Sequence, residues 1–315
     1  MEPLILGLDI GGTYVKFGMF DEHGNLKSKW QIKTVRGGDE LVELIWHSIQ
    51  ENIPEYEECV GIGIGVPGLV DHQNGSIIEA VNMGLSDFNI AEAFKRYTDI
   101  PVVLENDANA AALGEFWKDT GEVQDMILVT LGTGVGSGII IDSDLFRGKN
   151  GITGEIGHSI VDRNGYRCNC GRKGCLDTIA SSTGIVRAAL DAFDEHAVSF
   201  EKGISEDEMK AEDVFRLAEE GNATCQNVIQ HAVESLGFAL ANYASMMNPQ
   251  KILIGGGVSS AGQKFIDDIA SSFYTFSLSK IASTTLIEKA HLGNDAGITG
   301  AAYLIYKQTG RMIKQ

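Results

Sequence analysis

A histidine and three cysteines stand close together near the middle of the chain. His158 is followed by Cys168, Cys170 and Cys175, so three of the five cysteines fall within eight residues. Thiolate and imidazole are ligands that Zn²⁺ favours, and four of them complete a tetrahedral shell. Because such a shell leaves no position for an activated water, the pattern predicts a structural Zn²⁺ site. The alternative is a set of reduced or redox-active thiols without a metal.

The other two cysteines, Cys59 and Cys225, have no ligand partners nearby and are expected to be ordinary buried residues. An odd number of cysteines, and an N-terminus that leads straight into an apolar strand, favour a reducing compartment over disulfide bonds. We therefore expect a cytoplasmic protein.

Two glycine-rich turns follow apolar segments at corresponding points of the chain. The first is Asp9-Ile-Gly11-Gly12-Thr13, and the second is Leu131-Gly132-Thr133-Gly134-Val-Gly136. Glycines expose backbone N–H groups that wrap phosphate oxygens, and a carboxylate such as Asp9 holds Mg²⁺ directly or through water. A plain hairpin turn explains either motif alone. Two of them at matching points favour a clamp on a triphosphate.

A third glycine turn, Gly255-Gly256-Gly257-Val258, follows another apolar segment. Its lack of side chains lets a flat group such as adenine lie against the backbone, although a plain strand-to-helix turn is the alternative. The residues predicted to contact ATP and Mg²⁺ are Asp9, Gly11, Gly12, Thr13, Lys16, Gly132, Thr133, Gly134, Gly256, Gly257 and Val258.

Polar residues also stand where a predicted strand leads into an alanine-rich helix, in the run Glu105-Asn106-Asp107-Ala108-Asn109-Ala110. A carboxylate at such a junction can accept the proton of an attacking hydroxyl during phosphoryl transfer. The alternative is that Asp107 only caps the helix. Beside two phosphate turns, the catalytic base is the favoured interpretation. Gly68, Asn82 and Asp177 add loop backbone, amide and carboxylate groups suited to a hydroxyl-rich ligand.

Composition limits the class of protein. The chain has 315 residues, of which 43% are hydrophobic and 22% charged, which predicts a globular protein of two domains. No apolar run approaches the ~20 residues that span a bilayer. The net charge of −18 repels nucleic acid and anionic membranes, so neither is an expected partner.

The predicted elements occur in a repeating order. Strands are expected at 4–10, 14–20, 26–33, 60–66, 101–104, 126–131, 136–142 and 251–254, and helices at 40–52, 107–117, 225–247 and 295–306. The same order of elements starts near Leu4 and again near Met126: strand, glycine turn, strand, strand, helix, strand, helix. Ordinary α/β domains alternate strands and helices singly. A repeat that begins with a hairpin predicts two similar halves around a cleft.

These motifs resemble those of the ROK sugar kinases, most closely the bacterial glucokinase branch, over nearly the whole chain. The matching runs are Asp-Ile-Gly-Gly-Thr (9–13), Glu-Asn-Asp-Ala-Asn-Ala-Ala-Ala-Leu-Gly-Glu (105–115), Leu-Gly-Thr-Gly-Val-Gly (131–136), Gly-Glu-Ile-Gly-His (154–158), Cys-Asn-Cys-Gly-Arg-Lys-Gly-Cys (168–175), Ile-Leu-Ile-Gly-Gly-Gly-Val (252–258) and Leu-Gly-Asn-Asp-Ala-Gly (292–297). The resemblance implies an α/β fold of the actin-like ATPase (hexokinase/ribonuclease H-like) class. We expect a smaller N-terminal domain, 1–118 plus 298–315, and a larger domain, 119–297, that carries the zinc loop.

The resemblance also implies the activity, which is ATP- and Mg²⁺-dependent phosphorylation of the 6-hydroxyl of D-glucose. It makes Asp107 the general base. The sugar-binding residues that follow are Gly68, Asn82, Asn106, Glu155, His158 and Asp177. His158 would bind Zn²⁺ through one ring nitrogen and the sugar through the other. A homodimer or homotetramer is implied as well.

One departure from the family pattern bears on the substrate. The family usually has Glu after the Cys-Leu pair, and here Asp177 stands there, which puts the identity of the sugar in doubt. The alternatives are a ROK kinase for N-acetylmannosamine, allose, mannose or fructose, or a sugar-binding regulator without kinase activity. A DNA-binding regulator needs a helix-turn-helix ahead of the first strand, where only three residues precede Leu4. The acidic, poorly patterned segment 193–212 is assigned no role.

Overall fold

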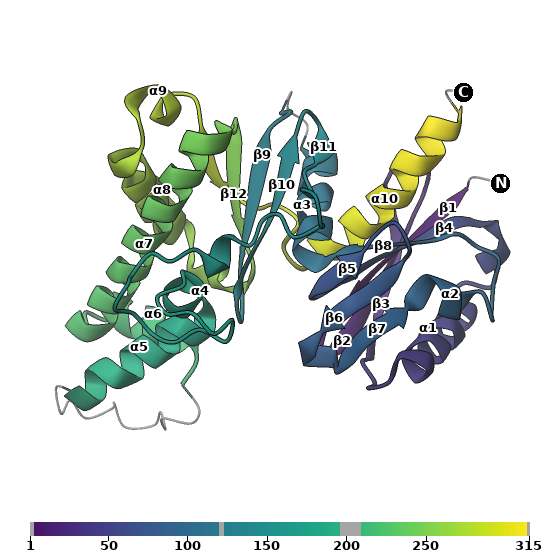
Figure 1. The fold of residues 1–315 in the computed structure, drawn as a ribbon, viewed down its shortest axis with the longest axis horizontal. Coiled ribbons are helices and arrows are strands. Elements are labelled where there is room, and N and C mark those ends of the chain that lie inside the picture. Colours follow the sequence, from purple (N-terminus) through teal and green to yellow (C-terminus); the bar gives the residue numbers. More distant parts are fainter. Residues whose placement is uncertain (1–2, 120–122, 196–208, 314–315) are drawn as a thin grey trace. The chain divides into compact units, whose positions relative to one another are not determined.

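The computed structural model describes residues 3–119, 123–195 and 209–313 (Figure 1). Its strands are β1 (Leu4–Ile10), β2 (Tyr14–Phe20), β3 (Leu26–Lys33), β4 (Cys59–Val66), β5 (Leu69–Asp71), β6 (Ser76–Ala80), β7 (Leu85–Asn89), β8 (Val102–Asn106), β9 (Met126–Leu131), β10 (Val135–Ile141), β11 (Asp144–Leu145), β12 (Lys251–Gly255) and β13 (Leu286–Lys289). Its α-helices are α1 (Gly38–Asn52), α2 (Ile90–Phe94), α3 (Asp107–Lys118), α4 (Asp177–Ala180), α5 (Ser182–Glu195), α6 (Ala211–Glu219), α7 (Ala223–Met247), α8 (Gln263–Phe276), α9 (Ser279–Ala282) and α10 (Ala296–Ile313).

The first sheet has the strand order β3-β2-β1-β4-β8. Strand β1 is antiparallel to β2 and parallel to β4, and β4 is parallel to β8. The carboxyl ends of β1, β4 and β8 therefore lie along one edge of the sheet. Ligands of open α/β sheets bind outside this edge. It is also where the chain places Asp9, Gly68 and Asp107, each at or just beyond the end of one of these strands.

A second sheet repeats this order with β11-β10-β9-β12-β13. Strand β9 takes the place of β1, and its parallel neighbour β12 takes the place of β4. Strand β13 is parallel to β12 as β8 is parallel to β4, and β11 is antiparallel to β10 as β3 is to β2. The repeat that the sequence predicted is confirmed at the level of sheet topology.

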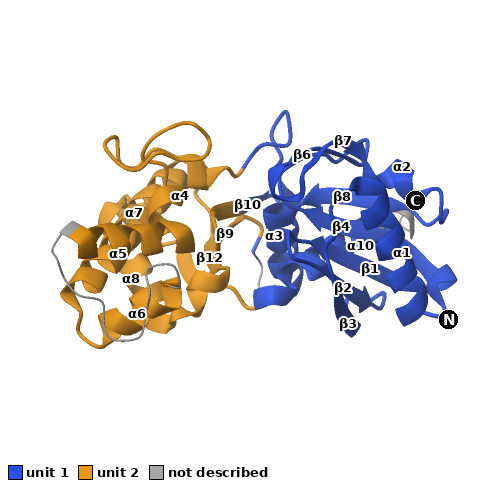
Figure 2. Ribbon diagram, turned by 90° about the horizontal axis from the view of Figure 1, so that it is seen from below, with its two compact units in different colours: residues 1–123, 138–153, 292–315 blue, residues 124–137, 154–291 orange. Residues whose placement is uncertain are grey.

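The chain divides into two compact units, coloured separately in Figure 2. Unit 1 comprises residues 1–123, 138–153 and 292–315, and unit 2 comprises residues 124–137 and 154–291. The predicted domains, 1–118 with 298–315 and 119–297, stay a prediction. The units differ from them chiefly because residues 138–153, which include most of β10, belong to unit 1.

Glycines let helix α10 and helix α3 approach their neighbours closely in unit 1. A Cβ at Gly7 of β1 or at Gly63 of β4 would overlap backbone atoms of α10. A Cβ at Gly300 of α10 would overlap the carbonyl of Ala110 in α3. The strands contribute fully buried aliphatic side chains such as Leu8 to the core. The close packing that the glycines of β4 predicted is confirmed, and it holds α3 against a rigid backbone.

Some elements differ from the sequence prediction. The three-stranded sheet β5-β6-β7 was not predicted, because its strands are short and carry polar residues between turns. Strand β8 begins one residue later and ends two residues later than expected. Of the segment 193–212, residues 196–208 lie outside the described part of the chain. None of the helices in the described ranges is long and apolar enough to cross a membrane.

Candidate active site and metal centre

The turn between β1 and β2 is the first predicted phosphate site. The N–H of Gly11 donates to the carbonyl of Tyr14 at 2.9 Å, and the hydroxyl of Thr34 donates to the carbonyl of Gly11 at 2.6 Å. These bonds fix the shape of the turn, while Gly12 and Thr13 remain exposed. The turn therefore offers backbone and hydroxyl donors to an anion.

Asp9 and Lys16 stand beside this turn on neighbouring strands. The Lys16 ammonium lies 3.4 Å from Oδ2 of Asp9, and the Asp9 side chain is 20% exposed. Burial raises the pKa of the Asp9 carboxyl, and the charge of Lys16 offsets part of that rise. Gly297 leaves room for this carboxylate, because a Cβ there would lie 2.8 Å from Cγ of Asp9. A half-buried carboxylate beside donors for phosphate fits Mg²⁺, which favours oxygen ligands.

The turn between β9 and β10 has similar bonds but a different charged neighbour. The Gly132 N–H donates to the Gly134 carbonyl at 2.9 Å, and the Ser182 N–H donates to the Gly132 carbonyl at 2.8 Å. Oδ1 of Asp177 accepts the N–H of Val135 at 2.7 Å. Asp177 was predicted as a sugar-binding residue, and the structure places one of its oxygens on this turn. The predicted phosphate turn and the end of the cysteine loop are therefore joined within unit 2.

Helix α3 is capped by Asn106 rather than by Asp107. Oδ1 of Asn106 accepts the N–H groups of Ala108 at 2.9 Å and Asn109 at 3.1 Å, while its Nδ2 donates to the carbonyl of Gly68 at 3.1 Å. This corrects the alternative in which Asp107 serves only as the cap, because the extended backbone of Asn106 puts its own side chain in that position. Asp107 is the first helical residue, and its Oδ1 also accepts the Ala108 N–H at 2.8 Å.

Two loops of unit 1 carry Gly68 and Asn82, which were predicted to bind the sugar. Gly68 has a φ of +100°, and a Cβ there would overlap the backbone of Glu79, so the position requires glycine. Asn82 is exposed in a 3₁₀ turn, Val81–Met83, and its carbonyl lies 3.9 Å from the position of a Cβ on Gly12. Asn82 is therefore close to the first phosphate turn.

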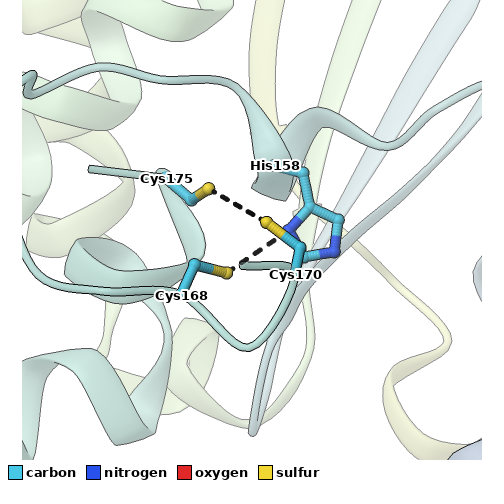
Figure 3. Close-up of side chains that lie close together, drawn as sticks. All are labelled: His158, Cys168, Cys170 and Cys175. Carbon is cyan, nitrogen blue, oxygen red and sulfur yellow. Dashed lines mark hydrogen bonds between the residues drawn. The ribbon is translucent and has the colours of Figure 1, made fainter. Parts of the chain in front are cut away.

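The predicted metal ligands converge in unit 2 (Figure 3). The ligand atoms of His158, Cys168, Cys170 and Cys175 all lie within 4.8 Å of one another. Sγ of Cys168 is 3.6 Å from Nδ1 of His158, and Sγ of Cys170 is 3.6 Å from Sγ of Cys175. A tetrahedral Zn²⁺ site with Zn–S bonds of about 2.3 Å holds its ligand atoms roughly 3.8 Å apart. The donor set and its spacing fit Zn²⁺.

The thiols of this cluster differ in exposure and in pKa. A hydrogen bond from the Arg172 side chain, at 3.4 Å, lowers the pKa of the exposed Cys170 to about 6. Burial raises the pKa of Cys175 to about 12. Binding a metal requires the thiolate form, so a bound cation would remove the proton from Cys175. Cys59 and Cys225 are buried and outside the cluster, as expected.

His158 and Glu155 place two polar atoms beside the cysteine cluster. With Nδ1 facing the cysteine sulfurs, Nε2 of His158 lies 3.9 Å from Oε2 of Glu155. The Glu155 side chain is half exposed. A metal on Nδ1 would fix the ring, and therefore the direction of Nε2. The role of His158 toward a metal on one side and a sugar hydroxyl on the other stays a prediction.

A cavity of about 500 Å³ in unit 2 adjoins the second and third glycine turns. The predicted Gly132, Thr133, Gly257 and Val258 line it. The rest of its lining was not predicted and comprises Ser182, Ala211, Glu212, Phe215, Arg216, Glu219, Ser260 and Ala261. Most of these residues belong to α6, whose start falls in the segment assigned no role. The strong separation of polar and apolar faces in 211–219 is the signal that could have identified this helix.

The predicted residues thus form two sets, one on each unit. Unit 1 carries Asp9, Gly11, Gly12, Thr13, Lys16, Gly68, Asn82, Asn106 and Asp107. Unit 2 carries Gly132, Thr133, Gly134, Glu155, His158, Cys168, Cys170, Cys175, Asp177, Gly256, Gly257 and Val258. Each set holds two carboxylates and a glycine turn predicted to bind phosphate, whereas the metal ligands and the cavity lie in the second.

Comparison with known proteins shows the family of the chain. A protein-family model described as the ROK family matches residues 5–308. A glucokinase of Halalkalibacterium halodurans is 39% identical, with 98% of this chain and 97% of the relative covered. An N-acetylmannosamine kinase of Yersinia pestis is 30% identical, with 94% and 96% covered.

A solved structure is similar over the same span. It is a ROK family glucokinase from Streptomyces griseus in complex with glucose and AMPPNP. It superposes with a TM-score of 0.80 at 32% identity, covering 96% of this chain and 98% of the other. The similarity therefore extends through both compact units.

Proposed function

Because this chain belongs to the ROK family, we propose that it is a glucokinase that transfers the γ-phosphoryl group of ATP to the 6-hydroxyl of D-glucose. The observation that carries the proposal is the position of Asp107. This carboxylate begins α3 at the carboxyl edge of the first sheet, along which the Gly11–Thr13 turn also lies. A base and a phosphate-binding turn on one edge are the two groups that phosphoryl transfer to an alcohol needs.

In the proposed reaction Asp107 accepts the proton of the 6-hydroxyl while the hydroxyl oxygen bonds to the γ-phosphorus. The bond between that phosphorus and the bridging oxygen of ADP breaks, and the proton later passes to solvent. The side chains of Asn82, Asn106, Glu155, His158 and Asp177, together with the backbone of Gly68, would hold the other hydroxyls. Because Asn106 caps α3 and also bonds to Gly68, the groups around the base are held in one orientation.

The nucleotide would be held by the glycine turns. Backbone donors of Gly11–Thr13 and Gly132–Gly134, with Lys16, suit the phosphates, and Asp9 would hold Mg²⁺, which neutralises phosphate charge. The cavity beside Gly257 and Val258 suits the nucleoside, with the exposed glycine backbone on one wall and α6 on the other. Its volume is within the range of small-ligand sites.

His158, Cys168, Cys170 and Cys175 would hold a structural Zn²⁺, which supplies rigidity to the loop that carries Glu155 and His158. The net charge of −18 and the reduced thiols support a cytoplasmic protein without nucleic-acid partners. We also propose that the chain forms a homodimer or homotetramer, because the resemblance to the ROK family implies one.

A coupled assay of ADP release with ATP and a panel of sugars tests the proposal. The panel is glucose, mannose, fructose, allose and N-acetylmannosamine, and kcat/KM is expected to be highest for glucose. A higher value for another sugar would support the alternative, a ROK kinase for that sugar. N-acetylmannosamine is included because the relative from Yersinia pestis is an N-acetylmannosamine kinase. Binding of glucose without turnover of any sugar would support the regulator instead.

A further inference from the structure

Glu105, two residues before the proposed base, carries a buried carboxylate. Its side chain is 2% exposed, although it stands at the functional edge of the sheet and was not among the predicted site residues. A buried charge is retained only where hydrogen-bond donors and an opposite charge replace its water. The partners of Glu105 therefore indicate what it does.

Both oxygens of the Glu105 carboxylate accept hydrogen bonds. Oε1 accepts the backbone N–H of Asn106 at 3.0 Å and Nδ2 of Asn109 at 3.0 Å. Oε2 accepts Nε of Arg147 at 2.7 Å. Arg147 follows β11 and is itself only 25% exposed in its side chain. Glu105 is thus the centre of a network within unit 1 that joins segments 42 residues apart.

The two groups bound to Oε1 flank Asp107 in the chain. Asn106 precedes the base and caps its helix, and Asn109 is two residues beyond it on the first turn of α3. One carboxylate therefore holds the backbone before the base and a side chain of the first helical turn after it. Such charge-assisted bonds are stronger than neutral ones.

We infer that Glu105 is a positioning residue for Asp107 and that Arg147 keeps this carboxylate oriented. The inference rests on the proposed kinase function. A displacement of a catalytic group by about 1 Å can cost roughly 100-fold in rate without a change in substrate affinity. Loss of the acceptor at Oε1 should therefore lower kcat and leave glucose binding intact.

A matched pair of double variants separates positioning from stability. Arg147→Met with Glu105→Gln removes both charges but keeps an oxygen for Asn106 and Asn109. Arg147→Met with Glu105→Met removes both charges and the oxygen at similar volume. We expect kcat to fall by only several-fold in the first and by about 100-fold in the second, with the Kd for glucose unchanged in both. Equal kcat values for the two, normalised to the folded fraction from circular dichroism, would overturn the inference.

If the variant with methionine at both positions does not fold, two milder single variants test the same inference. Asn109→Ala removes one of the two groups on Oε1, and Arg147→Lys keeps the charge but loses the fixed geometry of the guanidinium. Each should lower kcat by several-fold at unchanged glucose affinity, and wild-type kcat in both would contradict the inference. The wild-type protein is assayed alongside. If it phosphorylates no sugar, the proposed function fails, whereas an active wild type with insensitive variants refutes only the role of Glu105.

Discussion

The two compact units share one strand order but place different chemistry on it. Asp9 of β1 pairs with Gly65 of β4, and in the repeat Thr130 of β9 pairs with Gly255 of β12. These positions are equivalent, yet one carries a carboxylate and the other a neutral hydroxyl. The repeated topology supplies a glycine turn after each strand, whereas a carboxylate at this strand position, the kind of ligand that Mg²⁺ favours, is found only in unit 1.

The loops of the two units extend this difference. Unit 1 adds the proposed base, Asp107, and unit 2 adds the cysteine cluster, Glu155, His158 and the cavity. The comparison teaches that the fold repeats while the proposed base lies in one unit and the metal cluster in the other. Changes at Asp107 should therefore act mainly on turnover, and changes at the metal cluster mainly on glucose affinity and stability.

The largest effect is expected in unit 1 at the proposed base. Asp107→Asn keeps the size of the side chain but removes the proton acceptor, so kcat should fall by roughly 10²–10⁴. Glucose binding, measured by isothermal titration calorimetry, should be retained. A variant that keeps most of the wild-type turnover would show that Asp107 is not the base.

The equivalent strand positions offer a direct comparison. Asp9→Asn should weaken Mg²⁺-ATP binding or activity by roughly 10–100-fold, because the carboxylate beside the first turn is lost. Thr130→Val at the matching position of β9 is the control and should leave the Mg²⁺ dependence unchanged. Titration of activity against Mg²⁺ at fixed ATP measures both. Equal shifts in the two variants would abolish the distinction between the turns.

Removal of the metal tests unit 2. Cys170→Ser, or treatment with a chelator, should lower the melting temperature and weaken glucose binding by roughly 10-fold, because the loop of Glu155 and His158 loses its anchor. Zinc content by mass spectrometry and melting by differential scanning fluorimetry are the measurements. Cys225→Ala serves as the control, since this buried thiol lies outside the cluster. A zinc-free wild type that melts normally would contradict the structural role.

A smaller effect is expected at Asp177, which bonds to the turn of unit 2. Asp177→Asn keeps an oxygen for the Val135 N–H but loses the charge that would face a sugar hydroxyl. Loss of about 1 kcal/mol should raise the KM for glucose roughly fivefold at unchanged kcat. Asp177→Ala loses both contacts and should raise it further. If the two substitutions are indistinguishable, the contact with the turn contributes nothing and Asp177 acts only through the sugar.

The smallest effect concerns acid stability of the β2–β3 connection in unit 1. Although burial raises the pKa of Asp21, hydrogen bonds from Asn25, Lys27 and the His23 backbone outweigh it and hold the pKa well below its usual range. Because the folded-state pKa is below the unfolded value near 3.9, the stabilisation is present above about pH 4 and is lost as pH falls further.

Urea unfolding at pH 6 and pH 3 measures this contribution. Asp21→Asn should lose less free energy of unfolding between the two pH values than wild type, and Glu22→Gln, an exposed neighbour, should behave as wild type. The corresponding β10–β11 turn places Asp142 and Ser143 in the left-handed region, at φ of 50° and 64°, and its hydrogen-bonded carboxylate, Asp144, accepts Lys307 and the Leu145 N–H instead. An unchanged pH dependence in Asp21→Asn would show that this difference between the repeats has no energetic consequence.

The sequence by itself determined the features that depend on neighbouring residues. Alternating apolar residues and glycine turns placed β1, β2, β3 and β9 with the bounds that the structure has, and the spacing of one histidine and three cysteines identified a cluster whose ligand atoms converge. Such patterns are visible because strand periodicity, turn geometry and metal-ligand spacing act over a few residues.

Only the tertiary structure decided which distant side chains meet. It bonded Asn106 to Gly68, brought Arg147 to the buried Glu105, placed Asp177 on the turn of unit 2 and lined the cavity with α6. None of these contacts follows from local propensity. Each depends on how strands and helices pack across tens of residues, and a side chain that looks free in the sequence finds its partner only when the backbone that carries that partner has been folded against it.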